Sequence, residues 1–341
     1  MGRVNFCRVF LEKNCLSATG KLTLYPGAGI MEPNFPERSV PMARPPLRHA
    51  WLIITHGNFP ILEKQLAFLD SPNADFFIHV DAGVREADFD RFRSIPRSSR
   101  VFFTDRLKVS WGDFSLTEAT LELLRAAIPG QYDYYHLLSG VDVPLKTREY
   151  IEHYFDGRQG VNFINLERDV ISRRNMSRVK YYYPFQKWNI RNVTLRRIIR
   201  EATAMCQRIA FVDRTRKLPP DFVFQKATEW FSITHALAEY VLTKEEDIRA
   251  IFHDTFCSDE MFLPTIAVNS GFRDTIPPAD PARSHKNCLR YIDWQRGNPY
   301  TFTDGDFDEL ISADPEYLFA RKFDYKTNPR VVDDLFEALS R

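Results

Sequence analysis

Short apolar runs that end in polar residues alternate with segments of helical spacing through the first half of the chain. The apolar runs predict buried parallel strands, because strands covered on both faces have nearly continuous hydrophobic sequence. The expected strands are 50–56, 76–81, 101–103 and 134–140, and the expected helices are 60–69 and 114–128. This alternation predicts an α/β fold with a mostly parallel central sheet flanked by helices.

The rest of the chain divides into a leader and a single domain. Residues 228–242 predict a strand followed by a helix, so the globular pattern continues through 46–341. Residues 1–45 combine basic residues with several prolines and glycines, and we expect a poorly ordered leader there. In a second interpretation this leader is an annotation artefact, with translation beginning at Met31 or Met42.

The composition excludes several classes of protein. A net charge of +1 gives the whole chain no nucleic-acid signature. The five cysteines show no CxxC spacing, so neither a disulfide framework nor a zinc site is expected. The sequence contains no run of about twenty apolar residues, so no membrane-spanning helix is expected. We therefore expect a cytoplasmic protein that does not bind nucleic acid.

Polar residues at the ends of the expected strands indicate a ligand site, because ligands of such sheets bind beyond the carboxyl ends of the strands. His56 and Asp81 end two neighbouring strands, and the Asp81 carboxylate can accept hydrogen bonds from ribose hydroxyls or a uracil N–H. Asp142, in the turn 139–142, is expected to face a second substrate, the acceptor of a transferred group. Ordinary turn formation explains Asp81 and Asp142 equally well.

Glu260 is the candidate general base. It lies in the segment 257–263, where apolar residues follow it, and a carboxylate beside apolar residues can act as a base. Spacing alone favours the alternative, in which Ser258 caps a helix and Glu260 lies in its first turn.

Arg321 and Lys322 are adjacent cations between aromatic residues. A leaving nucleotide diphosphate develops negative charge, and fixed cations at that position lower the barrier. Two Asp-x-Asp sequences are candidates for a metal site, at 88–90 and 304–308, but neither follows a buried strand. We therefore expect no metal and no cofactor, with the two cations in place of a metal ion.

Two tryptophans and one more arginine complete the candidate site. Trp230 follows Glu229, and an aromatic face beside an acid suits a sugar acceptor, although a core position explains Trp230 equally well. Trp294 is expected to line the acceptor cleft, and Arg296 to approach the phosphates.

The basic segment 168–217 supports a different class of function. Its arginines and lysines, interleaved with aromatics, could bind polyanions or anionic lipid headgroups in a non-catalytic protein. A solvated helical face is the simpler interpretation of the segment. A metal-dependent α/β nucleotide hydrolase is a third hypothesis.

Five motifs in order resemble the core-2/I-branching glycosyltransferases, which include β-1,6-N-acetylglucosaminyltransferases and protein O-xylosyltransferases. The resemblance covers about Ala50 to Asp324. The motifs are Ile78-His79-Val80-Asp81, Ser110-Trp111-Gly112, Leu138-Ser139-Gly140-Val141-Asp142-Val143-Pro144-Leu145, Ser258-Asp259-Glu260 and Phe319-Ala320-Arg321-Lys322-Phe323-Asp324.

The resemblance implies a GT-A-like domain over residues 46–341 that inverts the anomeric carbon of a UDP-sugar without a metal. It matches Glu260 to the catalytic base, and Arg321 and Lys322 to the residues that clamp the diphosphate. Asp81 and His56 match the nucleoside pocket, and Trp230 and Trp294 match the acceptor cleft. Arg296 is the substitute for a second clamp arginine.

Two departures from animal members of that family narrow the expected function. Those members are disulfide-rich Golgi proteins with a membrane anchor, whereas this chain resembles a bacterial cytoplasmic relative. We expect GlcNAc or xylose to be transferred to a saccharide or glycoconjugate acceptor, in polysaccharide or glycoconjugate synthesis. The basic segment adds an expected peripheral contact with the inner face of the membrane.

Overall fold

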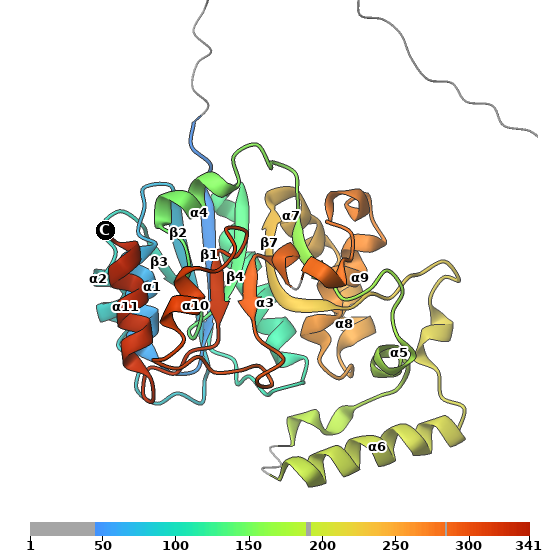
Figure 1. Ribbon diagram of the computed structural model, residues 1–341. Helices are drawn as coiled ribbons and strands as arrows, with labels where there is room; N and C mark the ends of the chain where they lie inside the picture. The colour runs from blue at the N-terminus through green and yellow to red at the C-terminus, as the bar shows by residue number, and fades with distance from the viewer. Residues whose placement is uncertain (1–44, 189–191, 284) are drawn as a thin grey trace, which may run out of the picture. The chain divides into compact units, whose positions relative to one another are not determined.

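A mixed six-stranded sheet forms the centre of the computed structural model, which describes residues 45–341 except 189–191 and 284 (Figure 1). The strands run in the order β3-β2-β1-β4-β7-β6. Their bounds are β1 His49–Thr55, β2 Ala74–Val80, β3 Val101–Phe103, β4 Tyr134–Ser139, β6 Phe163–Leu166 and β7 Ala227–Thr234. Strands β3, β2, β1 and β4 are parallel, as the apolar runs predicted, whereas β7 is antiparallel to both β4 and β6.

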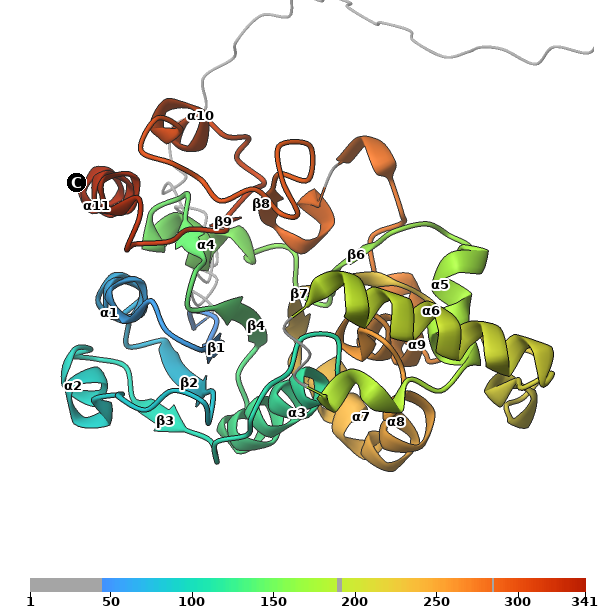
Figure 2. The ribbon, with the colours of Figure 1, turned by 90° about the horizontal axis from the view of Figure 1, so that it is seen from below.

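Helices cover both faces of this sheet (Figure 2). Alternate residues of β1 point to opposite faces, so Leu52 packs into one core and Trp51 into the other. Helices α3, α7, α8 and α9 cover the Leu52 face, and α1 and α4 cover the Trp51 face. Their bounds are α1 Phe59–Phe68, α3 Ser115–Ala127, α4 Arg148–Tyr154, α7 His235–Thr243, α8 Glu245–Phe252 and α9 Phe262–Val268. The predicted α/β fold is confirmed.

A second, three-stranded sheet was not predicted from the sequence. It has the order β5-β9-β8, with β5 Val143–Pro144, β9 Phe319–Arg321 and β8 Arg290–Ile292. Helices α10 (Phe307–Ile311) and α11 (Pro329–Leu339) pack against it around a third apolar cluster. Strands of two or three residues are too short for any alternation to show in the sequence.

Helices α2 (Phe89–Ser94), α5 (Arg173–Lys180) and α6 (Val193–Ile209) complete the fold. Figure 1 shows α6 set apart from the central sheet, beyond α5. Among the described helices, none has the length and apolar character needed to cross a bilayer. The predicted leader, 1–45, lies outside the described residues except for Pro45, and residues 45–341 form one compact unit.

Candidate active site

The carboxyl edge of the parallel strands is where distant parts of the chain meet. Strand β7 runs antiparallel to β4, so the start of β7 lies toward the end of β4. Strand β9 pairs with β5, directly after the turn that follows β4, with Ala320 opposite Val143. These two pairings bring Trp230 of β7, Asp142 of the turn and Arg321 of β9 to one place.

Arg321 lies at the centre of this group. Its guanidinium carbon is 3.8 Å from the centroid of the Trp230 ring, and its Nη1 atom is 3.6 Å from Oδ1 of Asp142. The side chain is 15% exposed, and Nη1 has no hydrogen-bond partner among the described residues. A buried arginine nitrogen without a hydrogen bond is costly, so the bonding capacity of this atom is not met by the described residues.

Asp142 is the carboxylate partner of Arg321. The residue has no exposed surface, and its two carboxylate oxygens accept hydrogen bonds from the backbone N–H of Ser139 at 2.9 Å and from the Ser139 hydroxyl at 2.8 Å. Both oxygens are thus buried and bonded to the turn, and the expected role of Asp142 in facing an acceptor stays a prediction. Its place is under Arg321, at the end of β4.

Trp230 likewise has little exposed surface, at 6%. Its ring is the platform on which Arg321 stacks, an arrangement in which a cation is attracted to the ring face. The alternative of a core position, left open by the sequence, describes most of this ring.

Glu260 ends a short 3-10 helix, η4 (Ser258–Glu260), and is held by two cations. Its Oε2 atom is 2.5 Å from Nη1 of Arg178 and 3.4 Å from Nζ of Lys226. The following residues Met261–Leu263 turn into the core. Contrary to the expectation from its neighbours in sequence, the Glu260 carboxylate therefore faces charged groups, and it remains 28% exposed.

The position of η4 is fixed by the core beneath it. The hydroxyl of the fully buried Ser258 lies 2.7 Å from that of Thr117 in α3. The predicted capping by Ser258 does not occur: η4 is preceded by Cys257 in the left-handed conformation, and no side chain caps it. Glu260 is thus presented at the surface by a turn that is anchored at its first residue.

Two further carboxyl groups, Glu229 and Asp259, adjoin Glu260. Burial raises the pKa of Glu229 well above its ordinary value; repulsion from Asp259 and Glu260 adds to the shift, and Arg321 opposes it. Burial, followed by repulsion from Glu260, raises the pKa of Asp259 to about 7. Neighbouring acids with shifted pKa values are frequent in active sites, because like charges in one buried place cannot all ionise.

Neither Asp259 nor Glu229 was predicted from the sequence as a site residue. Their signal was available in part, since each directly precedes a residue that was selected, Glu260 and Trp230. The sequence did not show that these two acids lie close together, because they belong to segments that only the fold brings side by side.

The nucleoside end of the expected site is defined by β1 and β2. Oδ1 of Asp81 accepts a hydrogen bond from Gly83 N–H at 2.6 Å, and Oδ2 accepts one from Val109 N–H at 2.7 Å. Asp81 therefore ties the end of β2 to the loop before α3, and each of its oxygens keeps a second lone pair. His56, one residue beyond β1, is exposed and forms no hydrogen bond with any described residue.

Gly140 permits the close approach of the β1 and β4 ends. A Cβ atom at this position would lie 2.3 Å from Oγ1 of Thr55 and 2.8 Å from its Cβ, so a larger residue would push the two strand ends apart. The Thr55 hydroxyl in turn donates to the carbonyl of Gly57, which shapes the loop that presents His56.

Arg296 is occupied elsewhere. Its Nε, Nη1 and Nη2 atoms each donate to a different carboxylate, those of Asp293, Asp306 and Glu309. All three nitrogens already have acidic partners, so a phosphate would compete with these carboxylates, and the assignment of Arg296 to the donor phosphates stays a prediction. Trp294 is 49% exposed, with its ring centroid 6.5 Å from that of His285. No contact among the described residues joins either side chain to Arg321.

Lys322 differs from Arg296 in this respect. Its backbone is fixed by hydrogen bonds with Tyr300 and Phe302, and its ammonium group makes no ion pair with any described residue. Of the three cations predicted to bind the diphosphate, Lys322 and Arg321 therefore have fewer acidic partners than Arg296.

Asp88 and Asp304, which begin the two Asp-x-Asp sequences, bond to backbone N–H groups at helix starts. Asp88 caps α2 by accepting from Arg91 N–H, and Asp304 accepts from Val331 N–H at the start of α11. Within the described part of the chain, no group of three or more His, Cys, Asp or Glu side chains is placed to hold a metal ion. The chemistry that the visible side chains can perform is proton abstraction by a carboxylate and stabilisation of a leaving anion by Arg321 and Lys322.

The chain matches known proteins over most of its length. A family model described as Core-2/I-Branching enzyme matches residues 49–311. Human xylosyltransferase 2 is 24% identical, over 86% of this chain and 34% of its own length. Human xylosyltransferase 1 is 23% identical, over 85% of this chain and 30% of its own length. The chain thus spans about a third of the length of these curated relatives.

One solved structure also aligns with the chain. The apo crystal structure of mouse xyloside xylosyltransferase 1 gives a TM-score of 0.34 at 12% identity, and the alignment covers 80% of this chain and 96% of that one. A likeness of this size supports no argument about the site.

Proposed function

The chain belongs to the Core-2/I-Branching enzyme family, and on this premise we propose that it is an inverting glycosyltransferase with a GT-A-like domain. It would transfer xylose or GlcNAc from a UDP-sugar to a hydroxyl of a saccharide or glycoconjugate acceptor. The names of the curated relatives favour xylose. A bacterial polysaccharide or glycoconjugate is the proposed product, and the proposed compartment is the cytoplasm.

The proposed reaction is a single displacement. The acceptor hydroxyl gives its proton to Glu260 while its oxygen forms a bond to the anomeric carbon. The bond between that carbon and the diphosphate oxygen breaks on the opposite face, and UDP leaves with the electron pair. Arg321 and Lys322 neutralise the charge that develops on the diphosphate.

The observation that supports this proposal best is the unused nitrogen of Arg321 beside a group of carboxyls. Glu229 interacts electrostatically with both Glu260 and Arg321, which supports the proposal that the acids and the cation act in one site. The Asp142 carboxylate, 3.6 Å from Nη1, and the Trp230 ring flank the guanidinium, and Nη1 forms no hydrogen bond with any described residue. An anion that binds there would complete the hydrogen bonds of Arg321.

We propose that the reaction needs no metal, and ligand binding offers a direct test. The melting temperature of the full chain would be measured with UDP, UDP-xylose and UDP-GlcNAc, each with EDTA and with Mn²⁺. A ligand that binds only the native state raises the melting temperature. A shift by UDP ligands that persists in EDTA supports the cationic clamp, and a shift seen only with Mn²⁺ would overturn the metal-free part.

The test of the reaction is Glu260→Gln, with Glu167→Gln as its matched control. Glu167 is also a partner of Lys226, at 3.3 Å, but it was not assigned a catalytic role. Release of UDP and formation of glycosylated product would be followed with a panel of saccharide acceptors. Glu260→Gln should lower the transfer rate by about a hundredfold or more and keep the UDP-induced melting shift. Glu167→Gln should keep most of the transfer rate. Full transfer by Glu260→Gln would remove Glu260 from its proposed role.

A further inference from the structure

Helix α6 shows its apolar side to solvent, the reverse of an ordinary surface helix. At 100° per residue, one side of the helix collects apolar residues, which are Leu195, Ile198, Ala202, Met205 and Ile209. All five are exposed; the exposed fractions are 58% for Ile198, 55% for Met205 and 70% for Ile209. No described residue of α6 is buried. The usual gain from packing an apolar stripe on the core is therefore absent.

Polar and cationic side chains attach α6 to the rest of the protein. The Arg196 guanidinium lies 4.8 Å from the ring centroid of Trp111, and that of Arg200 lies 4.4 Å from the ring centroid of Phe256. The Gln207 side chain bonds to both the N–H and the carbonyl of Tyr182. Rotation of the helix to bury its apolar side would break all of these contacts.

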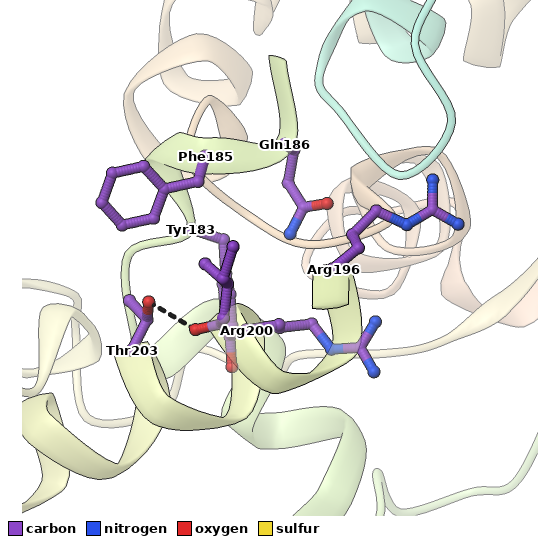
Figure 3. Close-up of a pocket in the computed structure, with 7 residues that line it drawn as sticks. Tyr183, Phe185, Gln186, Arg196, Arg200 and Thr203 are labelled. Atoms are coloured by element: carbon purple, nitrogen blue, oxygen red, sulfur yellow. Dashed lines mark hydrogen bonds between the residues drawn. The ribbon is translucent and has the colours of Figure 1, made fainter. Parts of the chain in front are cut away.

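Figure 3 shows this inner side at a small cavity between α6 and the 3-10 helix η2 (Pro184–Lys187). Arg196, Arg200 and Thr203 line it from α6, and Tyr183 lines it from the neighbouring segment. Its volume is about 10 Å³, room for about one water. The cavity is too small to take an apolar side chain from the outer side of the helix, so the outward orientation is built into the packing.

Exposed apolar residues are concentrated in this region. Of the fourteen large hydrophobic side chains that are exposed in the described part of the chain, eight lie within 182–211. Phe211, directly after α6, is 82% exposed, and Val193 at its start is 67% exposed. We call Leu195, Ile198, Met205 and Ile209, which share the apolar side of the helix, the α6 face. Patches of this kind on a monomer mark interaction sites.

The charge around the α6 face selects the partner. Residues 193–217 contain seven arginines and lysines but two acids. Exposed Arg197 and Arg208 flank the apolar side of the helix. A second copy of the chain would place these cations against each other across a two-fold interface. A nucleic acid would use the cations but not the aliphatic side chains.

We infer that the α6 face docks on a membrane surface that contains anionic lipid. Bulky apolar side chains on one side of a helix with arginines beside them suit the boundary between headgroups and acyl chains, where the helix lies in the plane of the bilayer. The arginines are attracted to the negative surface potential, and the apolar residues enter between the lipids. This inference is independent of the proposed transfer reaction.

The test uses the full chain and vesicles in a sedimentation assay. Vesicles of phosphatidylcholine alone would be compared with vesicles in which about a third of the lipid is phosphatidylglycerol. Stronger binding to the anionic vesicles is expected, and it should weaken as salt is raised. The double variant Ile198→Ser/Ile209→Ser should lose at least about tenfold in vesicle affinity, since two exposed apolar side chains no longer enter the bilayer. Arg197→Gln/Arg208→Gln should lose less, and only on anionic vesicles.

Val170→Ser is the matched control, because Val170 is 77% exposed but lies outside the α6 face. Its vesicle affinity should equal that of the wild type. The altered side chains are exposed, so melting temperatures should be unchanged and a loss of binding can be ascribed to the surface. Absence of binding to anionic vesicles, or equal binding by wild type and Ile198→Ser/Ile209→Ser, would overturn the inference. Dimerisation in sedimentation velocity that this variant abolishes would also overturn it, by assigning the face to a second copy.

Discussion

Arg321 and Arg296 have the same charge and lie in the same C-terminal region, yet the fold uses them differently. Arg321 is 15% exposed, stacks on Trp230, and has one carboxylate partner at 3.6 Å. Arg296 is 38% exposed, and its three guanidinium nitrogens each bond to a carboxylate. The first has bonding capacity that the protein leaves unused, whereas the second is fully compensated.

The difference indicates which of the two arginines is suited to bind an anion. A cation whose hydrogen bonds are complete gains little from a phosphate, because the phosphate would have to displace carboxylates that already bind it. A sparsely exposed cation with an unpaired nitrogen gains most. Two acids differ in the same way: Asp259 has an unbonded buried oxygen, whereas Asp293 is bonded by Arg296 and by backbone N–H groups.

The largest expected effect is on transfer. Arg321→Met should lower kcat/KM for a UDP-sugar by roughly 10²–10³-fold, the usual cost of removing one donor that stabilises developing negative charge. Arg296→Met should leave kcat/KM nearly unchanged, because its nitrogens are committed to Asp293, Asp306 and Glu309. Both variants would be measured in the UDP-release assay.

A melting curve accompanies both variants, because Arg321→Met leaves the buried Asp142 without its cation. If both variants fold and lose transfer equally, the contrast between the two arginines is wrong and Arg296 also acts in the reaction. A loss for Arg296→Met alone would reverse the assignment.

A smaller effect is expected on the pH dependence of stability at Asp259. Burial and the charge of Glu260 raise its pKa to about 7, so the folded state binds this proton more tightly than the unfolded chain does. The associated stability is present at low pH and is lost as the pH rises from about 4 to about 7. Asp259→Asn does not titrate, so its free energy of unfolding relative to wild type should increase over that window, by roughly 1–4 kcal/mol at about 1.4 kcal/mol per pKa unit. Urea unfolding at pH 4.5 and pH 8 measures this difference, and a difference that is the same at both pH values would contradict it.

The smallest effect is expected at Asp293, and with the opposite sign. Burial acts to raise its pKa, but hydrogen bonds from Arg296 and from two backbone N–H groups outweigh it, so the pKa is lowered. Stability from this group is present above the unfolded pKa, near 4, and is lost as the pH falls through the folded pKa. Asp293→Asn should therefore be less stable than wild type at pH 7, by less than about 1 kcal/mol for a surface pair. The deficit should shrink in acid, and thermal melts at pH 7 and pH 3.5 would show it. A deficit that grew on acidification would refute this explanation.

Much of the central sheet could be predicted from the sequence, because buried parallel strands have an unmistakable apolar pattern. The strands at 50–56 and 134–140 were found within one residue of β1 and β4. The second sheet was missed, since β8 and β9 have three residues each and gain their structure only by pairing with one another and with β5. The outward orientation of α6 was missed for a related reason. Its amphipathic pattern is visible in the sequence, but the direction of the apolar side depends on what Trp111 and Phe256 offer to its arginines.

The sequence by itself determined the fold class, the polar residues at the strand ends, and the chemical character of Glu260, Arg321 and Lys322. Which charges are compensated depends on the folded chain: Glu260 meets Arg178 across 82 positions, and Arg321 meets the distant Asp142 because β9 pairs with β5. The physical reason is that backbone pattern is a local property, whereas burial and ion pairing depend on which distant segments share one place.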